Sequence, residues 1–187
     1  MKDSPVRQNI VETASRLFYQ NGYNLTGINE IIKEAGIAKA TLYHHFKSKN
    51  DICLAYLQYK QETFLADASA YMKRASKGKD QLLALFDFLA LFFKNKDFNG
   101  CWCIKTVAEI PREDTLIKKE IQEQKNRFLK MLEEFVSENL EGHTKKERQL
   151  LSRQIYLLYE GAVAESHLHQ APWPIAAAKE ICAKLIA

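Results

Sequence analysis

The chain has 187 residues, of which 47% are hydrophobic and 27% are charged. This balance is sufficient for a substantial apolar core and excludes a disordered or fibrous chain. The N-terminal residues include no apolar run typical of a signal peptide, and no apolar stretch approaches the length that crosses a bilayer. We therefore expect a soluble, cytoplasmic protein without a membrane partner.

The four cysteines are Cys53, Cys101, Cys103 and Cys182. They form no CxxC pair, and the histidines do not complete a zinc-finger spacing. In a reducing compartment such cysteines are free thiols. We expect no disulfide, no structural metal and no cofactor.

The first quarter of the chain predicts several helices separated by clear breaks. Ser4 is a suitable N-cap for a helix that ends near Asn21, because Pro5 fits the first helical position. Further helices are predicted at 26–35, capped by Thr26, at 39–45, and from residue 49 to about residue 76. Gly36 breaks the chain between the second and third helices, which is the pattern of a helix-turn-helix.

The rest of the chain also follows helical periodicity. Further helices are predicted at 80–95, 101–110, 112–139, 144–170 and 175–186, with a stiff corner at Pro172-Trp173-Pro174. Alternation typical of strands and hairpin turns is absent from the sequence. The predicted fold is all-α with about nine helices.

Positive charge is concentrated near the predicted turn and third helix. Three lysines, two histidines and no acidic residue lie between Gly36 and Lys49. Such a patch suits a phosphate backbone, although charge alone fits a solvated surface equally well. The apolar pair Leu42 and Phe46, four residues apart, is expected to anchor this helix and leave its other side exposed.

The run LTGINEIIKEAGIAKATLYHHFKSK, residues 25–49, resembles the DNA-binding domain of the TetR/AcrR transcriptional regulators. The resemblance extends over residues 5 to about 55. It implies a helix-turn-helix DNA-binding domain at 1–48 and a ligand-binding and dimerisation domain at 49–187. Two positions depart from the family pattern, since Ala38 stands where a capping Ser is usual and Gly27 where a Thr or β-branched residue is common.

The resemblance implies a homodimeric, ligand-responsive regulator that binds double-stranded operator DNA, most simply a repressor and not an enzyme. A short helix with small residues near its N-terminus can enter the major groove closely. The predicted DNA contacts are Thr26, Gly27, Lys39, Ala40, Thr41, Tyr43, His44, His45 and Lys49.

The resemblance implies that the last two predicted helices pair with a second subunit; the alternative is that the first of them is an internal core helix. Apolar residues of the first of them are numerous: Leu150, Leu151, Leu157, Leu158, Ala162 and Val163. A small-molecule effector is expected to bind among the middle helices, in a site with aromatic lining and a few polar groups. The predicted ligand-binding residues, each of which could equally be a core residue, are Phe64, Phe88, Phe92, Trp102, Cys103, Phe128, Tyr156, Tyr159, Glu160 and His167.

Cys101-Trp102-Cys103 is the most unusual tripeptide of the chain. It suggests a second mechanism in which Cys101 or Cys103 senses oxidants or electrophiles, because a thiolate is favoured near a helix N-terminus. Simple packing remains the competing explanation. Two different functions would also suit an all-helical chain: an enzyme with a Cys–His pair, and a helical interaction module that does not bind DNA.

Overall fold

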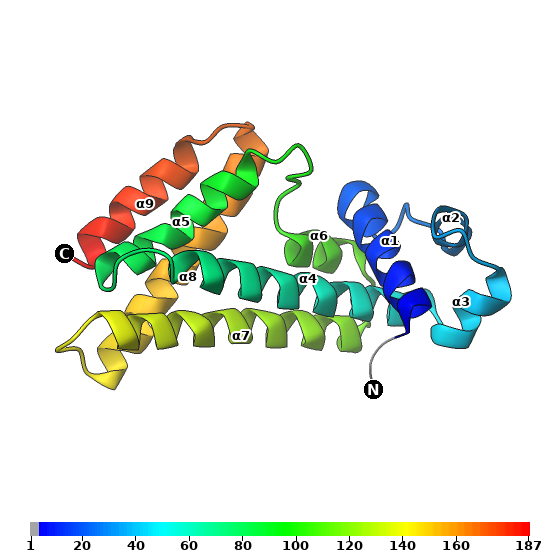
Figure 1. Ribbon diagram of the computed structural model, residues 1–187, viewed down its shortest axis with the longest axis horizontal. Helices are drawn as coiled ribbons and strands as arrows, with labels where there is room; N and C mark the ends of the chain where they lie inside the picture. The colour runs from blue at the N-terminus through cyan, green and yellow to red at the C-terminus, as the bar shows by residue number, and fades with distance from the viewer. Residues whose placement is uncertain (1–3) are drawn as a thin grey trace. The chain divides into compact units, whose positions relative to one another are not determined.

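The computed structural model describes residues 4–187, which form nine helices and no strand (Figure 1). The all-α prediction is confirmed for this part of the chain. The helices are α1 (Pro5–Asn21), α2 (Ile28–Glu34), α3 (Lys39–His45), α4 (Lys49–Met72), α5 (Lys79–Phe93), α6 (Trp102–Glu109), α7 (Thr115–Asn139), α8 (Lys145–His169) and α9 (Trp173–Leu185). Over the described range, none of them is long and apolar enough to cross a membrane.

Capping residues account for several of the helix ends. The backbone N–H of Arg7 donates to the Ser4 hydroxyl at 3.2 Å, and α1 ends at Gly22 with a positive φ of 92°. Thr144 and Glu147 form the reciprocal capping box that begins α8. These side chains satisfy backbone N–H groups that a helix leaves unpaired in its first turn, so the sequence locates the ends well.

Two helix starts differ from the prediction. Thr26 does not cap α2; its hydroxyl donates to the carbonyl of Gly22 at 2.8 Å, and Gly27 is the N-cap. The predicted stiff corner is the beginning of α9, with Pro172 as N-cap and Pro174 in the first turn. Proline is accepted there because the first-turn N–H groups have no partner within the helix.

The helices are distributed over two compact units. The N-terminal unit comprises Met1–Thr63 with Trp102–Gln124, and the C-terminal unit comprises Phe64–Cys101 with Lys125–Ala187. Helices α4 and α7 each contribute to both units. Our predicted domain boundary, between residues 48 and 49, lies at the end of the helix-turn-helix motif. The compact units divide the chain differently, because α6 belongs to the same unit as α1–α3.

The N-terminal unit has a small core around α1. Leu42 and Phe46 are 0% and 3% exposed, as expected for the anchors of α3. Helix α1 packs against α2, and α2 against α3. The buried apolar residues of this unit include Ile10, Ala14, Leu17, Phe18, Ile31, Ile52 and Tyr56.

The C-terminal unit has a larger apolar core formed by α5, α8 and α9 with parts of α4 and α7. Helix α9 packs against both α5 and α8, as Figure 1 shows. Leu151, Ala162 and Val163, which we expected at a dimer surface, are instead buried in this core. They point inward because α8 packs on α5 and α9 through that face.

Candidate nucleic-acid interface and effector region

The α2–α3 hairpin presents one side of α3 to solvent. Gly36 has a φ of +65°, a backbone conformation that residues with a side chain rarely adopt. This glycine allows the chain to turn between the two helices. Leu42 is fully buried on the opposite side of α3. The guanidinium of Arg7 lies 4.9 Å from the centre of the Phe46 ring and covers the end of this helix.

The predicted contact residues of α3 divide by exposure. Lys39, Ala40, Tyr43 and His44 are exposed, while Thr41 and His45 are half-buried. Tyr43 is 44% exposed, and the rings of His44 and His45 lie 5.0 Å apart. The structure therefore brings these residues together on one accessible helix, where the lysine and histidine side chains can reach an anionic backbone.

The three predicted contacts outside α3 are less uniform. Gly27 is exposed at the start of α2, but Thr26 is 0% exposed. The Lys49 ammonium lies 4.3 Å from the centre of the Tyr23 ring, and burial lowers the pKa of Lys49. Contact between DNA and any of these residues stays a prediction.

Sequence reasoning missed a set of polar contacts that hold the α1–α2 loop. The backbone N–H of Asn24 donates to the Glu109 carboxylate at 2.7 Å, and its side-chain amide donates to the Glu109 carbonyl at 3.0 Å. A Cβ at Gly22 would lie 2.4 Å from the same carboxylate. The end of α6 therefore packs directly on the loop that precedes the helix-turn-helix.

A second polar connection reaches the same loop from the beginning of α7. The Tyr23 hydroxyl donates to Asn50 at 2.5 Å, and the Asn50 amide donates to Asp114 at 2.6 Å. A further contact joins α6 to α1, where the Lys105 ammonium donates to the carbonyl of Tyr19 at 3.1 Å. No local sequence pattern signals these pairs, because their members are 27 to 86 residues apart.

The structure does not bring all of the predicted effector residues together. Phe64, Phe128 and Tyr159 are in mutual ring contact at 5.1 to 6.0 Å, and Phe88 and Tyr156 join them. These five rings form an aromatic cluster in the C-terminal unit. Trp102 and Cys103 belong to the N-terminal unit, so they are not part of that cluster.

Phe92 on α5 and His167 on α8, two further predicted effector residues, both lie beside Phe98. Phe92 and Phe98 are in edge contact at 5.5 Å, and Phe98 also meets the ring of His167 at 6.1 Å. The Nδ1 atom of His167 is buried without a hydrogen-bond partner among the described residues. Ligand binding by these residues remains a prediction, since every one of them packs against protein here.

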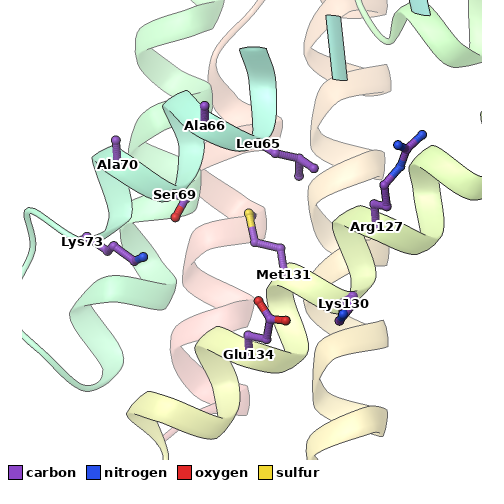
Figure 2. Close-up of a pocket in the computed structure, with 9 residues that line it drawn as sticks. All are labelled: Leu65, Ala66, Ser69, Ala70, Lys73, Arg127, Lys130, Met131 and Glu134. Carbon is purple, nitrogen blue, oxygen red and sulfur yellow. The ribbon is translucent and has the colours of Figure 1, made fainter. Parts of the chain in front are cut away.

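A groove of about 620 Å³ lies along α4 and α7 in the C-terminal unit (Figure 2). None of the predicted effector residues lines it. Its lining combines apolar side chains with three cations and one acid: Leu65, Ala66, Ser69, Ala70, Lys73, Arg127, Lys130, Met131 and Glu134. This volume is within the range of about 300–1,000 Å³ usual for small-molecule sites.

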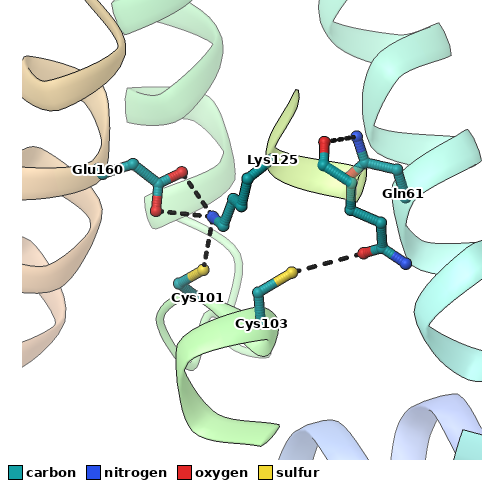
Figure 3. A network of polar contacts seen from close by, with 6 residues as sticks. Gln61, Cys101, Cys103, Lys125 and Glu160 are labelled. Carbon is teal, nitrogen blue, oxygen red and sulfur yellow. Dashed lines mark hydrogen bonds and ion pairs between the residues drawn. The ribbon is translucent and has the colours of Figure 1, made fainter. Parts of the chain in front are cut away.

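The two cysteines of the unusual tripeptide have different surroundings (Figure 3). Cys103 is 1% exposed, and its thiol donates to the side-chain oxygen of Gln124 at 3.4 Å. Gln61 donates to the backbone carbonyl of Gln124 at 3.0 Å, and the side-chain amide of Gln124 donates to Glu120 at 2.8 Å, which orients the acceptor oxygen. Cys101 is only partly buried, and the Lys125 ammonium donates to its sulfur at 3.3 Å.

Lys125 is also the centre of an ion pair within the C-terminal unit. Its ammonium lies 2.7 Å from both carboxylate oxygens of Glu160, so α7 and α8 are joined at this point. Among residues 4–187, no group of three or more His, Cys, Asp or Glu side chains is arranged to hold a metal ion.

Residues 10–56 match the family model described as bacterial regulatory proteins, tetR family. The matched residues form a TetR-family DNA-binding domain. Curated relatives of this chain include an HTH-type transcriptional regulator of Staphylococcus aureus, 42% identical over 96 residues, or 51% of this chain and 52% of the relative. The fatty acid metabolism regulator protein of Bacillus subtilis is 24% identical over 144 residues, or 76% of this chain and 72% of the relative.

A solved structure matches over nearly the whole length. A TetR-family transcriptional regulator from Streptomyces coelicolor superposes with a TM-score of 0.85 at 25% identity, covering 98% of this chain and 89% of that chain. In contrast, the chain spans about half the length of the staphylococcal relatives that it matches. The N-terminal helix-turn-helix is thus that of the TetR family, and the all-helical remainder shares the fold of this solved regulator.

Proposed function

We propose that this TetR-family protein is a ligand-responsive transcriptional regulator that binds operator DNA through α3. The observation that carries the proposal is the geometry of that helix: Leu42 and Phe46 are buried, while Lys39, Ala40 and Tyr43 face solvent. A helix so anchored can enter the major groove without losing its support. Repression is the simplest effect of such occupancy, and catalysis plays no part in the proposal.

Selection of bound fragments from the source genome tests the proposal. A specific operator should emerge, and affinity for it should fall steeply with salt because lysines displace counterions from phosphates. Thr41→Ala with Tyr43→Ala should abolish the preference for that operator. If the double variant kept the operator affinity of the wild type, α3 would not be the recognition helix.

Lys39 allows a matched comparison of charge. Lys39→Ala should weaken binding to all sequences and make the salt dependence shallower, since one phosphate contact is lost. Lys145→Ala removes the same charge from an exposed position at the start of α8 and should leave DNA binding unchanged. Equal effects of the two variants would mean that only net charge matters.

The proposal includes a homodimer formed through α8 and α9. Leu150, Leu157 and Leu168 are 57%, 67% and 72% exposed and recur along one side of α8, with the exposed Gly161 and Ala164 between them. Trp173 and Ile181 extend the apolar surface on α9, with 55% and 47% exposed. Exposed apolar surface of this extent typically marks an interface.

Leu157→Glu combined with Leu168→Glu should convert the dimer to a monomer in analytical ultracentrifugation. Leu116→Glu is the control, because Leu116 is 69% exposed on α7 in the other unit. Operator affinity should fall with the dimer, because two recognition helices about 34–36 Å apart meet successive major grooves. A double variant that stays dimeric rejects this surface.

The effector part of the proposal places the small molecule in the C-terminal unit. The groove along α4 and α7 supports it, since apolar lining beside Lys73, Arg127 and Lys130 suits an amphipathic molecule. Ala66→Trp should fill the groove with little strain, because Ala66 is exposed. An operator–reporter strain carrying this variant should stay repressed under growth conditions that release the wild-type protein.

A further inference from the structure

Cys101 differs from the other three cysteines in accessibility and in its neighbours. Cys53, Cys103 and Cys182 are buried, whereas Cys101 is partly exposed. Burial raises the pKa of Cys53 to about 12 and that of Cys182 to about 11, so both stay protonated near neutral pH. Only Cys101 combines access to solvent with a cation at its sulfur, the Lys125 ammonium at 3.3 Å.

The position of that cation is fixed by a third side chain. Glu160 holds the Lys125 ammonium at 2.7 Å from each carboxylate oxygen, and the two side chains are only 20% and 19% exposed. Figure 3 shows the ammonium between Glu160 and the sulfur of Cys101. A fixed ammonium beside sulfur stabilises the negative charge of the thiolate, which is the nucleophilic form.

We propose that Cys101, assisted by Lys125, is a site of covalent modification by soft electrophiles of the α,β-unsaturated carbonyl class. The sulfur bonds to the β-carbon, and the carbon–carbon π electrons move to the carbonyl as an enolate. The proton given up by the thiol returns, through solvent, to the α-carbon. The net reaction adds S–H across the double bond, so it needs no oxidant or reductant.

The surroundings of Cys101 explain how an adduct would affect the protein. The preceding residue, Gly100, is so close to α8 that a Cβ there would lie 3.1 Å from the His167 ring. Added bulk at the Cys101 sulfur competes for space with the Lys125 ammonium, which lies 3.3 Å away, so we expect it to loosen the ion pair between α7 and α8. The chain passes between the two compact units at Cys101–Trp102 and at Gln124–Lys125, so two of its crossings adjoin the modified cluster.

The regulatory consequence rests on the proposed function, namely that the protein binds an operator. Modification of Cys101 should weaken operator binding, because displacement begins at the residues where the chain enters the unit that contains α3. The chemical step itself does not depend on DNA. The two parts can therefore be measured separately.

The chemical step is tested with methyl vinyl ketone, used in limiting amount at pH 7 and followed by peptide mass spectrometry. Cys101 should react at least about tenfold faster than the other three cysteines. Cys101→Ser should lose the fast phase, Lys125→Met should slow it, and Lys125→Arg should largely retain it. Equal labelling of all four cysteines, or an unchanged rate in a folded Lys125→Met variant, overturns the proposal.

The regulatory step is tested on the selected operator. Stoichiometric labelling should lower the affinity of the wild-type protein by about 5- to 150-fold, the range typical of allosteric coupling, and leave Cys101→Ser unchanged. An adduct at Cys101 without any change in affinity overturns the regulatory step. If the unmodified protein binds no operator, the proposed function fails while the labelling result stands.

Discussion

Several polar contacts join distant segments in the N-terminal unit, whereas in the C-terminal unit a cluster of aromatic rings adds to polar contacts such as the Lys125–Glu160 ion pair. Glu109 contacts Asn24 across 85 residues, and Asn50 contacts Asp114 across 64 residues. In the C-terminal unit, Phe64 and Phe128 instead meet at 5.1 Å in a cluster of rings. The two units therefore join remote helices with a different balance of polar and aromatic contacts.

The difference matters because the two kinds of contact constrain a helix differently. A hydrogen bond fixes direction and distance but contributes only about 0.5–1.5 kcal/mol net. A buried ring contributes several kilocalories per mole, yet its neighbours can repack around it. We therefore expect the hydrogen bonds to fix the relative positions of segments within the N-terminal unit. We expect the buried rings of the C-terminal unit to contribute most of the free energy of unfolding.

The largest expected effect is in the aromatic cluster. Phe128→Ala removes a ring that is 2% exposed and touches Phe64, Tyr156 and Tyr159, and should destabilise the protein by about 3–5 kcal/mol. Urea unfolding measures the loss. Leu91→Ala, at a residue that is 58% exposed on α5, should cost far less. Similar losses of unfolding free energy in the two variants would contradict the importance of the aromatic cluster.

The next effect is a pH dependence of the unfolding free energy, which arises from one buried cysteine in each unit. The folded-state pKa of Cys53 is raised from 9.0 to about 12 by burial, with the nearby Asp114 carboxylate adding to the shift. The folded protein thus holds this proton more tightly, so the stabilisation is complete below pH 9 and is lost as the pH rises toward 12. The loss approaches about 1.4 kcal/mol per pH unit.

Urea unfolding at several pH values between about 8.5 and 10.5 checks this slope. Cys53→Ala should flatten it, and the difference between variant and wild type cancels the lysines and tyrosines that also titrate there. Cys182→Ala should flatten the slope over a narrower range, because the pKa of Cys182 is raised only to about 11. A slope that both substitutions leave unaltered would contradict the assigned burial.

The contact between α6 and the α1–α2 loop should have a smaller effect on stability. Glu109→Ala leaves the Asn24 N–H without its acceptor at an exposed position and should cost about 1 kcal/mol. Operator affinity should fall as well, because the loop before α2 loses its support. Glu109→Gln keeps an acceptor oxygen and should restore most of the affinity; no recovery would argue for the charge instead of the hydrogen bond.

The smallest expected effect concerns a polar contact within one helix, which we compare with the contact between α6 and the α1–α2 loop. Lys119 and Glu123 form an exposed pair at 3.9 Å, four residues apart on α7. Lys119→Ala should change the unfolding free energy by only about 0.3–0.5 kcal/mol. A loss as large as that of Glu109→Ala would show that polar contacts in this unit matter irrespective of the segments they join.

Local features of the structure were predictable from the sequence. Ser4 and Thr144 cap helices as expected, and Leu42 and Phe46 anchor α3, because caps and apolar spacing act within a few residues. The exposed side of α3 followed from the same spacing. The nine helices of the described range were all located, with differences of a few residues at their ends.

Contacts between remote residues were not predictable. Glu109 carries no local signal for Asn24, and Thr26 was expected to cap a helix because nothing in the sequence reveals that its hydroxyl reaches Gly22. Helix α8 is apolar around much of its circumference, so periodicity could not separate the buried Leu151 from the exposed Leu157. Those distinctions depend on which helix packs against which face.

The meeting of Gly22 and Glu109 also limits how this sequence can vary. Gly22 has φ 92° and ψ 165°, a conformation essentially restricted to glycine, and the Glu109 carboxylate occupies the space that a side chain would need. Shortening Glu109 would open that space, but the backbone conformation would still reject a side chain. In a library randomised at both positions, we expect residue 109 to accept substitutions and residue 22 to remain glycine.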